Sequence, residues 1–229
     1  MNHYDFAIRL VREAGKRIKD VHHNSIEVSY KDSEVRDIVT NIDIEINRFV
    51  TEEIKKEFPD HSIYSEEAKL QEKKSDYMWT IDPIDGSANF SRGIPHFACC
   101  LALLNNGIPV VGAIYNPVTD ELFSFEEGRG VFLNERPISV SRITKVADAQ
   151  ALLIVGHQVS LQDWGSATYR SFLEHFKKLK ALGSSALDLC FLASGRADVV
   201  VYGTLTTQDV SGAIGILRAA GGEIYTLDG

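Results

Sequence analysis

Two long apolar runs joined by a turn sequence constrain the fold of this chain more than any other feature. The runs extend from His96 to Leu104 and from Ile108 to Tyr115, and Asn105-Asn106-Gly107 lies between them. Asn and Gly tolerate the left-handed backbone of a short hairpin turn, so this segment predicts a β-hairpin. Further apolar segments at 122–125 and 131–133 predict additional strands. The chain is therefore expected to contain a multistranded, largely antiparallel sheet.

Helices are predicted before and after this sheet. Apolar residues recur at helical spacing from Phe6 to Val21, and a second helix is expected from Thr40 towards Phe58, where Pro59 stops it. The polar run 68–76 has the composition of a loop and is predicted to be a mobile flap. Later strands are expected at 151–155 and 199–202, and later helices at 164–179, at 183–194 and from 207. Four residues of the 164–179 helix are expected to face inward: Tyr169, Phe172, Leu173 and Phe176.

Composition excludes several classes of protein. With 229 residues and 44% hydrophobic content, the chain has enough apolar material for one domain or two closely packed halves. Its 24 Lys and Arg residues against 32 Asp and Glu give a net charge of −8, which offers no support for a nucleic-acid partner. No apolar run is long enough to span a membrane, and the N-terminus lacks signal-peptide features. We therefore expect a cytoplasmic protein whose Cys99, Cys100 and Cys190 are reduced and buried.

The segment from Tyr77 to Phe90 has the layout of a functional site. An apolar strand runs into Asp82-Pro83-Ile84-Asp85-Gly86, which predicts a strand ending in a tight turn. Two carboxylates this close repel each other unless one is protonated or a cation lies between them, and such oxygen ligands favour magnesium or manganese over zinc. Gly86 and Ser87 then offer groups that can bind an anion at a helix start. An ordinary Asp-Pro turn with an Asp-Gly corner explains the same residues without a metal.

Other acidic residues have local explanations as well. Thr40 followed by Asp43 predicts a helix N-cap with an acidic first turn, and capping alone accounts for both residues. Glu66 belongs to a Glu-Glu pair of a kind that is usually solvated on a surface loop. Asp209 fits the acidic first turn of the helix that opens at 207. None of these residues by itself requires a catalytic role.

The string from Ile81 to Phe90, Ile-Asp-Pro-Ile-Asp-Gly-Ser-Ala-Asn-Phe, closely resembles the signature of the inositol monophosphatase family of metal-dependent, lithium-sensitive phosphatases. The segment from Asp37 to Asp43 is similar to that family's Asp-x-Val-Thr-x-x-Asp motif, and similarity continues at 183–190. The resemblance extends from the first helix to Gly221-Gly222-Glu223-Ile224 and thus covers nearly the whole chain.

Two departures from the family pattern lie beside functional positions. Ser65 replaces a glycine before Glu66, which puts the local backbone conformation in question. Gln208 replaces a tryptophan before Asp209 but leaves the carboxylate in place. The positions that carry the family's chemistry are therefore all occupied by suitable residues.

The resemblance implies hydrolysis of a phosphate monoester by metal-activated water. Magnesium is the implied cofactor, as two or three ions, with manganese as an alternative and lithium as an inhibitor. The implied metal ligands are Glu66, Asp82, the Ile84 carbonyl, Asp85 and Asp209. The implied catalytic residues are Glu66, Thr40, Asp43 and Ser87. The implied substrate contacts are Asp85, Gly86, Ser87, Ser185, Tyr202 and Asp209.

The resemblance also implies a fold and an assembly. The fold class is α/β (α+β), as the layered α/β/α/β/α sandwich of inositol monophosphatase and fructose-1,6-bisphosphatase. We expect an N-terminal half at 1–145 with most metal ligands, and a C-terminal half at 146–229 that lacks the family's usual last strand and helix. A homodimer is implied by resemblance alone.

Three functions remain open at this stage. The first is an inositol phosphate phosphatase, and the second is a fructose-1,6-bisphosphatase or broad-specificity sugar phosphatase. The second is favoured by Tyr202, because inositol-specific relatives have a charged glutamate at that position and a phenol carries no charge at neutral pH. The third is a noncatalytic regulatory protein that binds macromolecular partners. The complete carboxylate set argues against the third.

Overall fold

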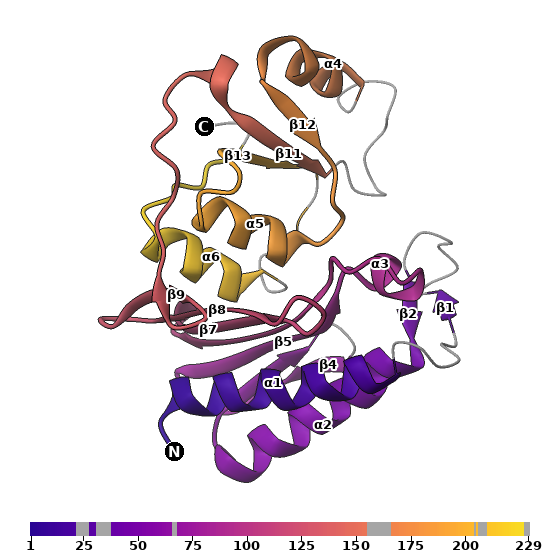
Figure 1. The fold of residues 1–229 in the computed structure, drawn as a ribbon. Helices are drawn as coiled ribbons and strands as arrows, with labels where there is room; N and C mark the ends of the chain where they lie inside the picture. Colours follow the sequence, from indigo (N-terminus) through magenta and orange to yellow (C-terminus); the bar gives the residue numbers. More distant parts are fainter. Residues whose placement is uncertain are drawn as a thin grey trace.

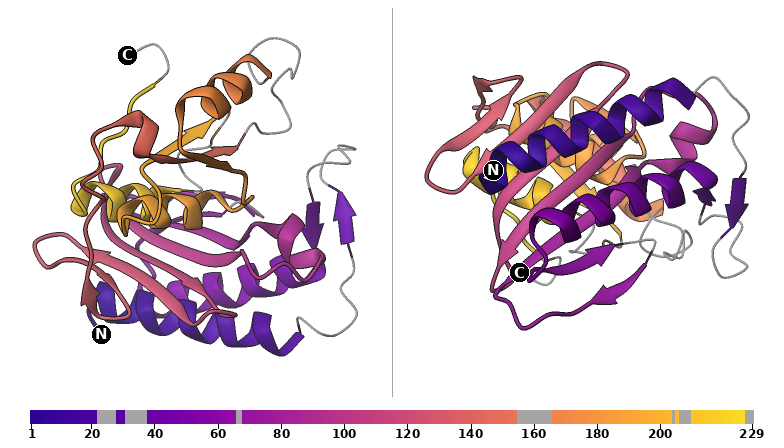
Figure 2. Two further views of the ribbon diagram at one scale, coloured as in Figure 1. Left: turned by 45° about the horizontal axis from the view of Figure 1, so that its top comes forward. Right: turned by 90° about the horizontal axis from the view of Figure 1, so that it is seen from below.

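Helices and sheets alternate in five layers (Figure 1). In the computed structural model, α1 (His3–Val21) and α2 (Asn41–Glu57) cover one face of an eight-stranded sheet, and α5 (Ser185–Ala193) and α6 (Ser211–Ala219) cover the other. A three-stranded sheet lies beyond α5 and α6, and α4 (Ser166–His175) is outermost. Figure 2 shows α1 and α2 side by side beneath the large sheet. The predicted α/β/α/β/α sandwich is confirmed.

The structure describes most of the chain. The described residues are 1–21, 28–30, 38–65, 68–154, 166–203, 205 and 210–226, without the side chains at 28, 30, 38, 39, 68 and 69. Within them, no helix combines the length and the apolar character needed to cross a bilayer. Four short elements lie outside these layers. Strands β1 (Val28–Tyr30) and β2 (Ile38–Thr40) form a two-stranded sheet, and the other two are α3 (Ser87–Ser91) and the 3₁₀ turn Val146–Asp148.

The eight-stranded sheet has the order β10-β9-β8-β7-β6-β5-β3-β4. Its strands are β3 (Ser62–Ser65), β4 (Ala68–Gln71), β5 (Tyr77–Asp85), β6 (Ala98–Asn105), β7 (Ile108–Asn116), β8 (Glu121–Glu126), β9 (Gly130–Leu133) and β10 (Arg136–Pro137). All pairs are antiparallel except β3 with β5. The predicted hairpin joins β6 to β7, with Asn106 and Gly107 at φ values of 49° and 81°. The expectation of a largely antiparallel sheet is confirmed.

Strand β6 is apolar from Ala98 to Leu104, and both of its faces are buried. Cys99, Leu101 and Leu103 pack into the core beneath α1 and α2, whereas Ala98 and Cys100 pack into the core beneath α5 and α6. The second core also contains Cys190, and all three cysteines are buried free thiols as predicted. The central strands thus tie the two cores together.

Helix α6 approaches the large sheet very closely at one point. A Cβ atom on Gly112 of β7 would lie 2.8 Å from the carbonyl oxygen of Gly212 in α6. Two glycines facing each other therefore allow backbone to meet backbone. The smaller sheet, β12 (Lys178–Lys180), β11 (Gln150–Ile154) and β13 (Val199–Tyr202), is entirely parallel.

Two predictions about secondary structure are corrected. The predicted flap 68–76 begins with strand β4, which pairs with β3 at the edge of the sheet. A polar sequence is compatible with an edge strand, because such a strand is exposed on one side.

The predicted helix 164–179 ends at His175 and is followed by β12. Its inward face is also wrong in part, because Tyr169 and Leu173 are 46% and 59% exposed. Phe172 and Phe176 are half-buried and stack on each other.

Candidate active site

A bulge at the end of β5 brings the two signature aspartates to the same face of the sheet. The predicted strand 77–81 continues to Asp85, and the pairing with β6 shifts between Asp82, opposite Cys100, and Asp85, opposite Ala98. Three residues of β5 therefore match two of β6, and Pro83, which has no N–H group to donate, lies in the extra segment. Residues opposite each other in an antiparallel pair share a face. Because Ala98 and Cys100 face α5 and α6, both carboxylates project to that side.

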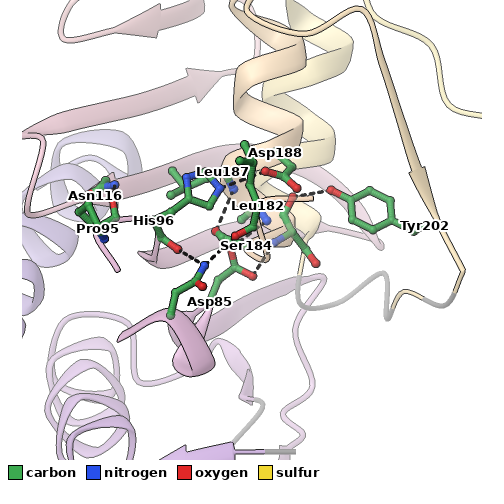
Figure 3. A network of polar contacts seen from close by, with 12 residues as sticks. Asp85, Pro95, His96, Asn116, Leu182, Ser184, Leu187, Asp188 and Tyr202 are labelled. Carbon is green, nitrogen blue, oxygen red and sulfur yellow. Dashed lines mark hydrogen bonds and ion pairs between the residues drawn. The ribbon is translucent and has the colours of Figure 1, made fainter. Parts of the chain in front are cut away.

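The carboxylate of Asp85 is held by the first turn of α5 (Figure 3). Its Oδ1 accepts from the Ser185 N–H at 2.9 Å, and its Oδ2 accepts from the Ala186 N–H at 2.9 Å and from the Ser184 hydroxyl. Burial raises the pKa of Asp85 to about 6, against the hydrogen bonds from Ser184, Ala186 and Ser185, which lower it. A nearby Asp188 raises it further. An anion at a helix N-terminus is a favourable arrangement.

A second group joins Thr40, Asp43 and Ser87. Thr40 is the predicted N-cap of α2 and forms a capping box with Asp43: the Thr40 N–H donates to Asp43 Oδ2 at 2.8 Å, and the Thr40 hydroxyl is bonded to the same oxygen. Asp43 Oδ1 lies 3.0 Å from the Ser87 hydroxyl, which is also 2.8 Å from the Ile84 carbonyl oxygen. A hydroxyl has one hydrogen and serves one acceptor at a time. Capping explains the first contacts but not the contact with Ser87.

Ser185 connects Asp85 to Tyr202, because its N–H donates to Asp85 and its carbonyl oxygen contacts Tyr202. The Tyr202 hydroxyl donates to the Ser185 carbonyl oxygen at 2.7 Å, and burial raises the pKa of this phenol. Tyr202 is therefore a neutral group whose hydrogen is already used within the protein. Asp85, Ser185 and Tyr202 are thus brought together at the start of α5, and Gly86 lies against Ser184, whereas Ser87 contacts Asp43 and the Ile84 carbonyl.

Two predicted metal ligands, Glu66 and Asp209, lie outside the described residues. The described residues alone hold no cluster of three or more His, Cys, Asp or Glu side chains that could bind a metal ion. Immediately before Glu66, Ser65 is buried and its hydroxyl donates to Asn47 Oδ1 at 2.5 Å. The serine that replaces the family's glycine is therefore accommodated by a hydrogen bond to α2.

Sequence reasoning missed the residues that connect α5 to the signature segment. The Asn89 amide donates to the carbonyl oxygens of His96 and Leu182, each at 2.8 Å. His96 Nε2 lies 3.0 Å from Asp188 Oδ1. The expected strand 96–104 begins at Ala98, so His96 precedes it. The signal for Asp188 is that it is the single charged residue of α5, in which every residue after Ser185 except Asp188 is apolar.

The fold and site together define a layered α/β protein with buried carboxylates at the end of a central strand. Carboxylate and carbonyl oxygens of this kind suit a hard divalent cation. The profile of the inositol monophosphatase family matches residues 2–229. The chain belongs to this family, whose members are metal-dependent and hydrolyse phosphate monoesters, and its activity is of that type.

Individual relatives agree with this assignment. The chain is 33% identical over 229 residues to a fructose-1,6-bisphosphatase/inositol-1-monophosphatase of Thermotoga maritima, covering 100% of this chain and 86% of the relative. It is also 33% identical to the Nus factor SuhB of Pasteurella multocida, covering 98% and 85%. The solved structure of a Thermotoga maritima IMPase superposes with a TM-score of 0.87 at 32% identity, covering 95% of this chain and 82% of that one.

We expect Gly86→Ala to damage the site more than its backbone conformation alone would explain. Gly86 has a φ of +91°, and a Cβ atom there would lie 3.0 Å from the His96 carbonyl oxygen and 3.2 Å from Ser184 Cβ. The matched control is Gly128→Ala, where φ is +78° and no atom lies within 4 Å. Both variants strain the backbone by about 1–2 kcal/mol, and only the first adds about 1–3 kcal/mol of overpacking.

Thermal unfolding and phosphatase assays measure the two effects. Gly86→Ala should lower both the melting temperature and turnover, because the added methyl group displaces the α5 N-terminus from Asp85. Gly128→Ala should keep wild-type turnover. Equal loss of stability in both variants, with turnover intact, would show that Gly86 serves only its own backbone conformation.

Proposed function

We propose that the chain is a magnesium-dependent phosphatase that acts on inositol phosphate or a related sugar phosphate by means of metal-activated water. The observation that carries this proposal is the position of Asp82 and Asp85 on one face of the sheet, next to the Asp43–Ser87 contact. Buried carboxylates at this spacing repel each other without a cation. A structural turn has no need for such an arrangement.

The proposed metal ligands are the carboxylates of Asp82 and Asp85 and the carbonyl of Ile84, with Glu66 and Asp209 from outside the described residues. All are hard oxygen ligands, which magnesium prefers, and manganese accepts the same set. Bound magnesium would supply a nucleophilic water and stabilise charge on the phosphoryl oxygens. By resemblance to the family, two or three ions and inhibition by lithium are proposed as well.

The chain's own residues would prepare the site for this chemistry. Asp43 accepts hydrogen bonds from Thr40 and holds the Ser87 hydroxyl, so Thr40 and Ser87 can orient a water molecule between them and the substrate. Gly86 and Ser87 would lie against the phosphate. Asp85 and Ser185, held together at α5, would face the alcohol part of the substrate.

The alcohol specificity is proposed to be broad. The position that carries a charged acceptor in inositol-specific relatives is Tyr202, and its hydroxyl hydrogen is directed to the Ser185 carbonyl. A charged acceptor contributes on the order of 1.5–3 kcal/mol to a hydrogen bond, which Tyr202 cannot supply. Sugar phosphates such as fructose 1,6-bisphosphate should therefore be hydrolysed with a kcat/KM comparable to that for inositol 1-phosphate.

A substrate panel with and without magnesium tests the proposal. We expect turnover of several phosphate esters that depends on magnesium and stops on chelation, with comparable kcat/KM for inositol and sugar phosphates. A kcat/KM for inositol 1-phosphate about a hundredfold or more above the others would sink the broad specificity. No hydrolysis of any ester, together with a reproducible protein partner, would favour the noncatalytic alternative. In that case the phosphatase assignment would be wrong for this chain.

We also propose a homodimer and a cytoplasmic location. Family resemblance is the support for the dimer, and light scattering that gave a monomer at micromolar concentration would refute it. The three buried free thiols are compatible with a reducing compartment. Recovery of the protein from a periplasmic or secreted fraction would refute that location.

A further inference from the structure

The buried pair His96–Asp188 is poorly suited to a purely stabilising role. Asp188 is fully buried, and one carboxylate oxygen lies 3.0 Å from His96 Nε2. Its other oxygen has no hydrogen-bond partner among the described residues. A buried carboxylate with a single partner costs free energy that a well-packed apolar side chain would not. The pair therefore calls for an explanation other than stability.

Asp188 lies on the turn of α5 that holds Asp85. The Ser185 and Ala186 N–H groups grip the Asp85 carboxylate, and Asp188 follows Ala186 by two residues on the same helix. His96 reaches this turn from the segment after α3, and its ring also contacts Phe191 one turn further on, at 5.3 Å between ring centroids. Helix α5 is thus held at two points, by Asp85 of the signature segment and by His96, which lies six residues beyond that segment.

Asn89 makes the connection rigid. Its amide donates both to the His96 carbonyl and to the Leu182 carbonyl just before α5 (Figure 3). The side chain of His96 and the carboxylate of Asp85 are therefore fixed to the same short stretch, residues 182–188. Any movement of α5 that breaks one contact strains the other.

We propose that His96 and Asp188 are positioning residues that keep the first turn of α5 in register with Asp85, and so keep that carboxylate directed at the metal site. The inference rests on the proposed function, because it takes Asp85 as a metal ligand. When a residue that orients a metal-ligating side chain is replaced, metal affinity or activity typically falls by about 10–100-fold. The pair thus connects the position of α5 to the orientation of Asp85 at the end of β5 in the large sheet.

The test measures manganese binding to the full chain by electron paramagnetic resonance. Magnesium-dependent kinetics are measured on the same variants. Asp188→Leu removes the pair and its charge, and we expect manganese affinity to fall by about 10–100-fold while the melting temperature holds or rises. Asp188→Asn can still accept from His96 and should restore most of the affinity. His96→Gln provides an independent way to weaken the pair should Asp188→Leu fold poorly, and it should likewise lower manganese affinity.

The matched control is Asp198→Asn. Asp198 is a partly buried carboxylate bonded by Ser141 and by the Gln150 N–H at the other end of α5. This variant should lose stability and keep wild-type manganese affinity. Unchanged affinity in both Asp188→Leu and His96→Gln would overturn the inference alone. Failure of the wild-type chain to bind manganese would overturn the proposed function, and this inference with it.

Discussion

Asp85→Asn is expected to lower kcat by about a thousandfold or more in the presence of magnesium. A bound metal ion lowers the free energy of the charged transition state by several kcal/mol, and this stabilisation is lost when a ligand is removed. Each 1.36 kcal/mol corresponds to about tenfold in rate. The amide also lacks the second acceptor oxygen that now receives the Ala186 N–H and the Ser184 hydroxyl. A loss of about 1–3 kcal/mol of stability is therefore expected alongside the loss of turnover.

Asp198→Asn separates these two effects. Its carboxylate also accepts a hydroxyl and a backbone N–H, from Ser141 and Gln150, but lies away from the signature segment. It should unfold at a lower temperature than wild type and keep full turnover. Near-normal phosphatase rates in purified Asp85→Asn would show that Asp85 is not a metal ligand.

Asp43→Asn is expected to lower turnover by about 10²–10⁴-fold, the range typical of residues that assist proton transfer from a reacting group. In the structure, one oxygen of Asp43 completes the capping box with Thr40 and the other meets Ser87 at 3.0 Å. An amide cannot satisfy both sets of donors. Removal of the capping interaction should also cost about 0.5–2 kcal/mol of stability.

Asn2→Ala is the control for capping alone. The Asn2 side chain accepts from the Asp5 N–H at 2.7 Å at the exposed start of α1, far along the chain from the signature. Its loss should lower the melting temperature without changing kcat. If Asp43→Asn behaved in the same way, with lower stability and wild-type kcat, Thr40 and Asp43 would be a helix cap and nothing more.

Local sequence patterns predicted those parts of the fold that depend on neighbours in the chain. The Asn105-Asn106-Gly107 turn needs two successive residues with positive φ, and the hairpin between β6 and β7 turns at Asn106 and Gly107, which have this conformation. The Thr40–Asp43 box depends on residues three apart and was confirmed in both directions of its hydrogen bonding. Periodicity failed at 164–179, because the segment packs weakly and half of its expected inward face is exposed.

The sequence alone determined which residues are available for chemistry and where the apolar strand before them begins. It identified Asp82, Asp85, Thr40 and Asp43, since a strand, a turn and a cap each leave a local pattern. Only the tertiary structure placed Ser184 beside Asp85, 99 residues away in the chain, and Asp188 beside His96, 92 residues away. Such contacts depend on how α5 packs on the large sheet. The bulge that turns both aspartates to one face depends in turn on pairing with β6, which no spacing within the signature encodes.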